Sequence, residues 1–589
     1  MRNRKSLSRR DFIKISIIGT AALNGVSPLL AHQIGEQIEE TPTWTETMPN
    51  GIAAGDATQN SVVLWTHSTA PGTVTFRYAA STAWWDYRAR YTQSAEVSDP
   101  TIPVKVQVAH LQPDTEYVYQ VRDAAGSRIS GRFRTLPAAD QPAKNGLHFG
   151  VTGDWRGELR PFVSVSNVAA RKLDFFMELG DTIYADIPSL DLPAGQARTL
   201  AEYRIKHNEV YSARYDQNHW ADIRASTGVY VVHDDHEVCD DYAGGAAPSN
   251  DARFDQTGDR INQTDLYKNG MQALSEFNPL RDEIYSGTGD ARVEGRPKFY
   301  RSLTFGTTAA MIVLDARSFR DKEETQLSPT QVINPIALGR GLAAMFEPNR
   351  TMLGQPQLSD LKRDLLAAHE AGIIWKFIMI PEPIQHMGWF GGVDRWEGYA
   401  PERTEFLKFI EDNAIRNVVF ITADVHTTFI NNLTYQTEAG GAQIPTHCFE
   451  ISTECAAFYP PTGQIIMDTA AEIGLLSKDK YDAYQKLPIP EKDTQLEELF
   501  NRVVLKLQGF TPLGLEDSLI TWERTKGGWI VGHTFGWTEF EIAPETEKLT
   551  ITTYGVPAYN PVEARLKSER ILGYEPEIMS QLIITPQTT

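Results

Sequence analysis

The chain of 589 residues contains only three cysteines, and none of them forms a Cys-x-x-Cys pair. This scarcity argues against a disulfide scaffold and an iron–sulfur cluster, because both need several closely spaced cysteines. One disulfide bridge remains possible, most simply between Cys448 and Cys455, whereas Cys239 is expected to be a packing residue. A Gly-x-Gly-x-x-Gly turn is also missing, which argues against a dinucleotide-dependent redox enzyme.

Positive charge is scarce as well, because 56 Lys and Arg residues stand against 76 Asp and Glu residues, for a formal net charge of −20. Such a chain repels a nucleic-acid backbone or an anionic membrane surface, so neither is expected as its main partner. An anionic substrate would need local positive charge, and a metal ion is the obvious source. With 41% hydrophobic residues, the length predicts two or more domains, or one enlarged domain with an accessory.

Long apolar runs are few, and the N-terminal one is short. Residues 1–31 have a basic start, an apolar stretch from Ile15 to Val26 and a small residue at Ala31. The stretch is interrupted by glycine and too short for a stable membrane span, so it predicts an export signal. Arg9 and Arg10 in "SRRDFIK" resemble the twin-arginine signal, whose export machinery carries folded proteins. An ordinary secretory signal is the alternative; either predicts a periplasmic or secreted protein.

A polar linker, residues 32–49, precedes short runs of alternating apolar and polar residues in the segment 50–138. Turns rich in Gly, Pro, Asp and Asn separate these runs, a pattern typical of a β-sandwich. The stretch "LQPDTEYVYQV" (111–121) resembles a corner of fibronectin type III domains. We therefore expect a small all-β domain of the fibronectin or immunoglobulin type at residues 50–138.

The segment 145–560 has a different pattern, in which continuous apolar runs are each followed by polar residues. Six such runs occur: "LHFGVT", "LDFFMEL", "GVYVV", "AAMIVLD", "IIWKFIMI" and "NVVFIT". Continuous runs favour strands that are buried on both faces, and helical patterns at 358–371 and 401–414 lie between them. The segment predicts a layered α/β domain, αββα, with ligand sites at the carboxyl ends of the strands. Residues 561–589 are expected to form a separate C-terminal segment.

Acidic residues follow four of these runs, and histidines accompany two of them: Asp154, Asp181, Asp235, His236, Asp424 and His426. One such residue could simply cap a turn. Several carboxylates at one sheet edge repel one another unless cations neutralise them or their pKa values rise. Two metal ions that share a carboxylate would meet this need, and they suit phosphoryl transfer because they activate water and hold phosphate oxygens.

The order of the motifs carries a resemblance to the metallophosphoesterases, whose four blocks they follow: GD-x-R (153–156), LGDTIY (179–184), DDHE (234–237) and ADVH (423–426). Three segments resemble marks of the PhoD family of alkaline phosphatases and phosphodiesterases: GDTIYAD (180–186), LDARSFRD (314–321) and RWEGYAPER (395–403). That family joins a twin-arginine signal and a small N-terminal β domain to a metallophosphatase domain. The resemblance implies an exported, metal-dependent phosphoesterase that hydrolyses small-molecule phosphomonoesters, phosphodiesters or both.

The resemblance also implies metal ligands. Asp181 would bridge two metal ions, Tyr184 would bind a ferric ion through its phenolate, and His426 would complete that site. Asp424 would face a second, harder ion, expected to be calcium. Asp235 stands where the superfamily has a metal-binding asparagine. The expected ions are therefore Fe³⁺ and Ca²⁺, with other divalent ions as alternatives.

Further roles follow from the same resemblance. His236 would donate a proton or contact the transition state, and Glu237 would orient it. Asp154 stands where the family commonly has a cysteine, which leaves the identity of the metals open. Arg156 replaces the first-block histidine; it would either grip the phosphate or form a surface ion pair.

Some assignments remain open at this point. Asp234 has no assigned role, Glu382 and His386 in "PEPIQH" are weak candidates, and Asp240 and Asp241 are expected to form an acidic turn. Monoesters, diesters and phospholipids are not distinguished by the sequence, so a phospholipase D-like phosphodiesterase of the same family is one alternative. A non-catalytic, exported calcium-binding module is another.

Overall fold

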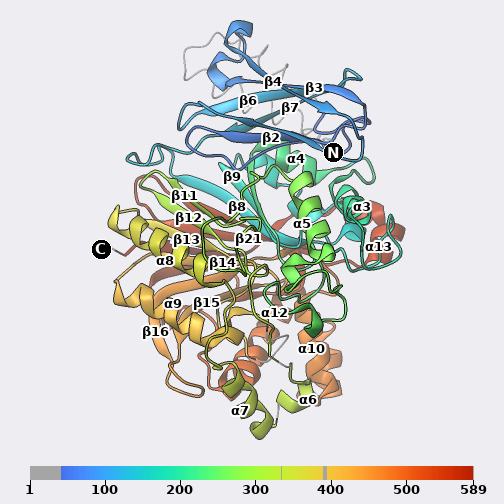
Figure 1. Ribbon diagram of the computed structural model, residues 1–589. Helices are drawn as coiled ribbons and strands as arrows, with labels where there is room; N and C mark the ends of the chain where they lie inside the picture. The colour runs from blue at the N-terminus through green and yellow to red at the C-terminus, as the bar shows by residue number, and fades with distance from the viewer. Residues whose placement is uncertain (1–41, 325, 333, 389–393, 588–589) are drawn as a thin grey trace, which may run out of the picture.

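The computed structural model describes residues 42–324, 326–332, 334–388 and 394–587. The predicted signal peptide and much of the linker therefore lie outside the described residues. Within the described part, no helix is both long enough and apolar enough to cross a membrane. Figure 1 shows a small β domain at one end of a larger body that contains sheets and helices.

The N-terminal domain is a sandwich of two sheet layers, as its alternating pattern predicts. The outer layer is a four-stranded antiparallel sheet in the order β4-β3-β6-β7: β3 Gly72–Ala80, β4 Tyr91–Val97, β6 Glu116–Arg122 and β7 Arg128–Arg134. The inner layer contains β1 Ile52–Gly55, β2 Val62–Thr66 and β5 Val104–Val108. Buried and solvent-facing residues alternate along β7, so one face of the outer sheet forms the core and the other faces away from it.

The inner layer does not end at the domain boundary but continues into the body. Strand β1 pairs in parallel with β10, and Ala54 lies opposite Gly228, the first residue of β10. The resulting eleven-stranded sheet contains seven further strands on its main path: β8 Leu147–Trp155, β9 Phe175–Leu179, β10 Gly228–Val232, β18 Thr521–Lys526, β20 Thr534–Ile542, β21 Leu549–Pro557 and β22 Glu577–Thr585. The N-terminal domain therefore joins the body at the amino ends of the parallel strands.

A second, seven-stranded sheet packs against the first. Its strands are β11 Arg301–Phe305, β12 Ala309–Val313, β13 Trp375–Met379, β14 Val418–Thr422, β15 Thr428–Tyr435, β16 Ile444–Ser452 and β19 Ile530–Val531. Phe149 of β8 meets Phe377 of β13 edge-on, with ring centroids 5.1 Å apart. The six apolar runs that predict buried strands form β8, β9, β10, β12, β13 and β14.

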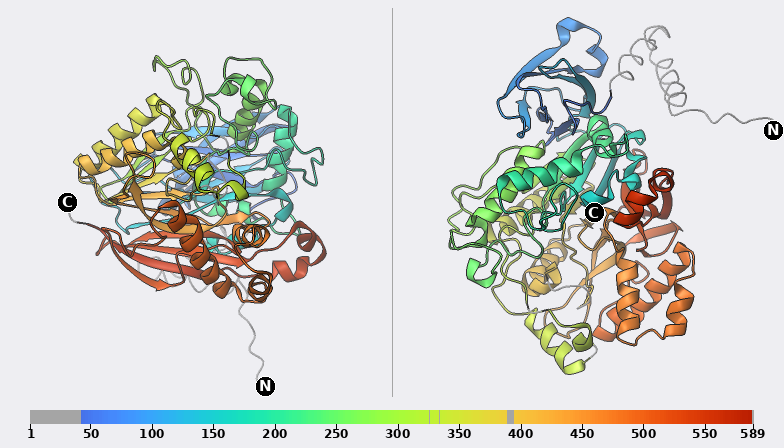
Figure 2. Two further views of the ribbon diagram at one scale, coloured as in Figure 1. Left: turned by 90° about the horizontal axis from the view of Figure 1, so that it is seen from below. Right: turned by 90° about the vertical axis from the view of Figure 1, so that its right-hand side faces the viewer.

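Helices cover the outer faces of the two sheets, which confirms the layered α/β architecture (Figure 2). On the seven-stranded sheet lie α8 Gln355–Glu370 and α9 Ala400–Asp412, which share a buried core with β12, β13 and β14. Packed with the other sheet are α3 Leu200–Tyr211, α4 His219–Ser226 and α5 Asp265–Phe277. The remaining helices are α6 Pro329–Val332, α7 Pro335–Ala344, α10 Thr462–Glu472, α11 Lys478–Tyr484, α12 Ile489–Leu499, α13 Pro561–Leu566 and α14 Ser568–Leu572.

The structure also shows the state of the cysteines: all three are free and buried. Cys448 lies in β16 of the seven-stranded sheet, whereas Cys455 begins β17 Cys455–Ala457, which pairs with β8 of the other sheet. The two thiols are therefore held in different sheets, and no bridge joins Cys448 to Cys455.

Candidate metal centre

The predicted ligands lie at the carboxyl ends of parallel strands or directly after them, and they meet at one edge of the two sheets. Four of them have left-handed backbone angles: φ is 64° at Asp154, 49° at Asp181, 63° at Asp424 and 54° at His426. Residues other than glycine adopt this region rarely and at a cost in free energy, and such residues cluster at functional sites. This backbone turns short polar side chains out of the strands and toward one another.

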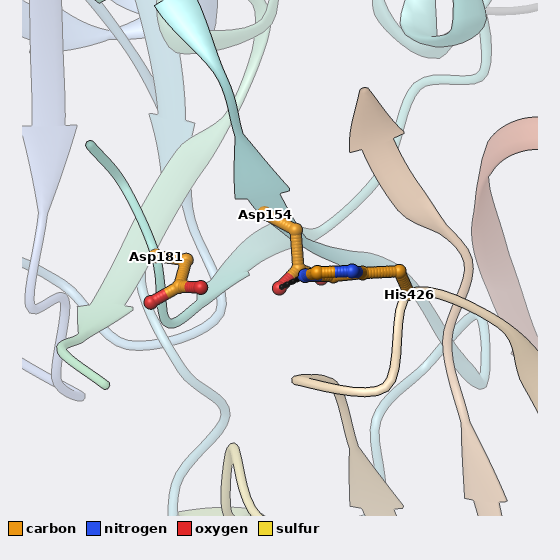
Figure 3. A group of neighbouring side chains, drawn as sticks. All are labelled: Asp154, Asp181 and His426. Carbon is orange, nitrogen blue, oxygen red and sulfur yellow. Dashed lines mark ion pairs between the residues drawn. The ribbon is translucent and has the colours of Figure 1, made fainter. Parts of the chain in front are cut away.

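The first group of ligands consists of Asp154, Asp181, His426 and Tyr184. Ligand atoms of the two aspartates and His426 lie within 4.8 Å of one another, and Figure 3 shows these side chains converging from separate segments. His426 Nε2 lies 3.3 Å from Asp154 Oδ1 and 3.0 Å from the Tyr184 hydroxyl. Asp181 also belongs to a second group, with Asp235 and His236, so its carboxylate lies between the two.

The hydrogen bonding of Asp154 indicates that these residues fit a cation. Asp154 is 1% exposed, yet neither of its carboxylate oxygens has a hydrogen-bond partner among the described residues. A buried polar group without a hydrogen-bond partner costs about 1–3 kcal/mol, and a charged carboxylate costs more. The donors around it are carboxylate and phenol oxygens and an imidazole nitrogen, which suit hard cations such as Fe³⁺ and Ca²⁺.

The pKa values give the same indication. Burial, followed by the carboxylates of Asp235, Asp234 and Asp154, raises the pKa of Asp181 well above its usual value. Burial and the Asp181 carboxylate likewise raise the pKa of Tyr184. Without a cation these groups repel one another as anions, and a bound cation would reverse the shifts.

A further carboxylate group surrounds Arg317, a residue to which the sequence analysis gave no role. Oxygens of Glu382, Asp394 and Asp424 lie within 4.8 Å of one another. The guanidinium of Arg317 lies 2.6 Å from Glu382, 3.2 Å from Asp394 and 3.6 Å from Asp424. It also binds Asp234 through two nitrogens, at 2.6 and 3.1 Å. Arg317 is fully buried, so it supplies positive charge to the centre of this acidic region.

His236 is held in one orientation by Asp186. The imidazole Nδ1 lies 2.7 Å from Asp186 Oδ1, and the backbone N–H of His236 donates to Asp181 Oδ1 at 3.3 Å. The other ring nitrogen, Nε2, lies 4.0 Å from Asp181 Oδ2, beside the first group of ligands. Burial would lower the pKa of His236, but the carboxylates of Asp235 and Asp186 raise it to about 10.

Glu237 does not orient His236, so that part of the sequence prediction is wrong. Its carboxylate accepts hydrogen bonds from the backbone N–H and hydroxyl of Thr182, both at 2.6 Å, and from the backbone N–H of Asp234. Glu237 therefore ties the loop after β9 to the loop after β10. The preceding residue, His236, points toward Asp186.

Arg156 adopts the ion-pair alternative. Its guanidinium lies 3.2 Å from Glu158 and donates to the carbonyl of Tyr459 at 3.1 Å. It also lies 5.6 Å from the centroid of the Phe458 ring, which stacks on His426 with centroids 4.0 Å apart. These contacts give the expected phosphate grip no support.

The structure also locates residues whose roles the sequence left open. Asp240 and Asp241 belong to ligand groups with Asp235 and His236, so they face the site instead of forming only an acidic turn. The neighbouring Asp394 carboxylate raises the pKa of Asp241 to about 9. His386 lies apart from the described groups, stacked on Phe510 with centroids 4.3 Å apart, and burial lowers its pKa to about 4.

The residues that sequence reasoning missed lie in or directly beside segments that carry the family resemblance. Arg317 lies in "LDARSFRD" and Asp186 ends "GDTIYAD", two segments that carry the family resemblance. Asp394 directly precedes "RWEGYAPER". The motifs thus marked the right segments, but only the structure shows which side chains point into the site.

Comparisons with known proteins agree with this architecture. The PhoD-like phosphatase model matches residues 153–466, and the model of its N-terminal domain matches residues 35–137. Alkaline phosphatase D of Bacillus subtilis (strain 168) is 27% identical over 476 residues, which cover 74% of each chain. The solved structure titled "Structure of PhoD" superposes with a TM-score of 0.62 at 19% identity, covering 93% of this chain and 94% of that one. The chain therefore belongs to the family of PhoD-like phosphatases, and it is a phosphoesterase by this membership.

Proposed function

We propose that the chain is an exported, metal-dependent phosphoesterase that hydrolyses phosphomonoesters, phosphodiesters or both. The observation that carries this proposal is the convergence of Asp154, Asp181, Tyr184 and His426, with both oxygens of Asp154 buried and without a hydrogen-bond partner among the described residues. Metal ions at such a site activate water and neutralise phosphoryl oxygens in the transition state. The name of the Bacillus subtilis relative, alkaline phosphatase D, supports the same activity.

Each residue of the centre has a distinct task under this proposal. Asp154, Tyr184 and His426 would hold one cation, and Asp181 would be shared with a second cation beside Asp235. Asp424 lies in the neighbouring group with Glu382 and Asp394, where Arg317 already supplies positive charge. Arg317 thereby lowers the repulsion among the acids on that side of the site.

His236 is the proposed proton donor to the leaving oxygen. Asp186 binds its Nδ1, which leaves Nε2 to face the first group of ligands. A fixed imidazole that keeps a proton on Nε2 meets the geometric requirement for general-acid catalysis. Arg156, which Glu158 and Tyr459 hold, has at most a supporting role.

The metals can be identified from colour and composition. A ferric ion bound to the Tyr184 phenolate should give a visible charge-transfer band, whereas a calcium-only protein should be colourless. Metal analysis of the same sample then reports whether calcium accompanies iron.

The test of the activity compares p-nitrophenyl phosphate with bis(p-nitrophenyl) phosphate at alkaline pH, before and after chelation. We expect hydrolysis of at least one ester, its loss on chelation and its return when the metals are added back. Cleavage restricted to diesters and phospholipids would favour the phospholipase D-like alternative. A folded protein that binds metal and hydrolyses neither ester would favour the calcium-binding module and contradict the proposal.

A further inference from the structure

The outer sheet of the N-terminal domain carries a face of arginines that the proposed function does not use. Arg122 of β6 lies directly opposite Arg128 of β7, with Thr75 of β3 in the same row. Because side chains alternate along a strand, Arg77, two residues after Thr75, points to the same side. Arg77, Arg122 and Arg128 are all exposed. In the described part of the chain, none of these three forms an ion pair, whereas Arg134 of the same sheet binds Asp114.

Two acids near this face are engaged elsewhere. Asp123, which follows Arg122, is buried and accepts hydrogen bonds from Thr47 and from the backbone N–H of Ser127. Glu96, one row away, accepts from the hydroxyl of Thr73 at 2.9 Å. Like charges directly opposite one another destabilise a sheet, so the pair of Arg122 and Arg128 has an unfavourable interaction that an anionic partner would relieve.

Exposed aromatic rings border the arginines. The segment 81–90 crosses the same face, where Trp84 packs on Ala79 of β3 and Val118 of β6. Next to it, the side chains of Trp85 and Tyr87 are 63% and 72% exposed. Trp85 Nε1 donates to the carbonyl of Thr82 at 2.7 Å, so the indole presents hydrocarbon to its surroundings. Arginines beside exposed Trp and Tyr rings are typical of surfaces that sit among lipid headgroups.

We propose that this face, formed by Arg77, Arg122, Arg128, Trp85 and Tyr87, docks on a membrane surface rich in anionic lipids. The chain's net charge of −20 does not oppose this, because residues 51–137 contain eight Lys and Arg against seven Asp and Glu. Charges beyond about 8 Å are largely screened at physiological salt, so the local charge decides. The outer sheet also lies at the end of the molecule, away from the body (Figure 1).

Docking by this face would leave the metal centre open to the aqueous side. The N-terminal domain joins the body at Gly228, the amino end of β10, whereas the ligands follow the carboxyl ends of the strands. The face therefore acts as an anchor that does not touch the substrate.

The test is co-sedimentation of the full chain with vesicles of phosphatidylcholine that contain phosphatidylglycerol. The test variant combines Arg77→Gln, Arg122→Gln and Arg128→Gln. The control combines Arg340→Gln, Arg502→Gln and Arg565→Gln, which makes the same charge change at exposed positions of the body. We expect the test variant to bind roughly 100-fold more weakly, at about 1 kcal/mol for each arginine, and the control to bind like the wild type.

A second variant, Trp85→Ser with Tyr87→Ser, should also weaken vesicle binding, and circular dichroism with thermal unfolding will show whether each variant is folded. The proposal is overturned if the wild type binds vesicles of pure phosphatidylcholine as tightly as it binds the anionic vesicles. It is also overturned if the control variant loses as much binding as the test variant. Binding to heparin without binding to the anionic vesicles would overturn it as well, in favour of a soluble polyanion.

Discussion

Asp186 gives His236 a defined role in the site, because its carboxylate takes the Nδ1 side and leaves Nε2 beside the ligands. Replacement of Asp186 by Asn should lower kcat about 10–100-fold with little change in KM, the usual effect of losing a group that orients a functional histidine. Asp240 also faces the site, 3.7 Å from His236 Nε2, but its side chain is 64% exposed and does not bind Nδ1, so Asp240→Asn should lose less activity. Steady-state kinetics of Asp186→Asn and Asp240→Asn would contradict this assignment if both lost activity equally.

Arg317 has a stability role that can be separated from catalysis. Its removal leaves Asp234 buried without its cationic partner and takes from Glu382 one of its two arginines, the other being Arg320 at 2.7 Å. Leaving a buried acid unpaired typically costs about 3–5 kcal/mol. We expect Arg317→Met to lose that much free energy of unfolding in metal-free protein, measured by urea denaturation. Arg156→Met should lose less than about 1 kcal/mol, because its ion pair with Glu158 is partly exposed.

Equal losses in the two arginine variants would show that Arg317 does not neutralise the acidic region. If Arg317→Met fails to fold, Arg317→Lys provides a milder change. Lysine keeps the charge but lacks the planar fork that binds Asp234 through two nitrogens, so an intermediate loss is expected.

At the level of residues, the sequence predicted ligands better than their partners. Asp154, Asp181 and His426 were predicted because acids after buried strands are unusual, and the structure brings them together. Arg317 was not predicted, because an arginine in a loop has many surface roles, and nothing in the sequence shows that it is buried. Glu237 was misassigned because neighbours in sequence point in different directions.

At the level of elements, the pairing of β8 with β20 is fixed by a charged cluster. Glu539 of β20 lies 2.7 Å from His148 Nε2 and 2.6 Å from Arg171 Nε. Burial would raise the pKa of Glu539, but its hydrogen bonds from His148 and Arg171 lower it to about 2. The ionised carboxylate therefore stabilises the fold above its ordinary pKa of about 4, and this contribution is lost as the pH falls toward 2.

The variant Glu539→Gln should lower the free energy of unfolding at pH 7 by about 1–3 kcal/mol, the worth of hydrogen bonds to a charged group. It should also remove the part of the acid sensitivity that lies between pH about 4 and 2. Urea denaturation at pH 7 and at acidic pH measures both effects. A variant as acid-sensitive as the wild type would contradict the role of Glu539.

The strands that were predicted and those that were missed differ in burial. The six continuous apolar runs were predictable because both of their faces are covered. Strand β4, "YTQSAEV", has no such apolar run, because it is an edge strand in which only Val97 is buried. The segment 561–589 was expected to stand apart, yet β22 in it pairs with β21 and β18, which only long-range contacts could reveal.

For the whole molecule, the layered fold was predictable from the sequence. The connection between the N-terminal domain and the body was not. The parallel pairing of β1 with β10 makes one layer of the N-terminal domain part of the large sheet. Residues about 170 positions apart form this pairing, and no local pattern predicts it. The domain limits proposed from the sequence, 50–138 and 145–560, remain predictions.

Export is also a property of the whole molecule. If Arg9 and Arg10 form a twin-arginine signal, replacing both by lysine should keep the protein inside the cell while the folded chain stays active. Fractionation followed by immunoblotting would measure this. Unchanged export of the double variant would favour an ordinary secretory signal.

The central claim is that the carboxylates at the sheet edge hold the metal ions on which phosphoester hydrolysis depends. The most direct measurement determines the metal content and the rate of p-nitrophenyl phosphate hydrolysis on the same samples of wild type and Asp181→Ala. Because Asp181 belongs to both ligand groups, the variant should lose bound metal. Its activity should fall by more than about 100-fold, the upper end of the loss that removal of an orienting residue causes. A variant with reduced metal content and full activity, or with unchanged metal content and unchanged activity, would contradict the account.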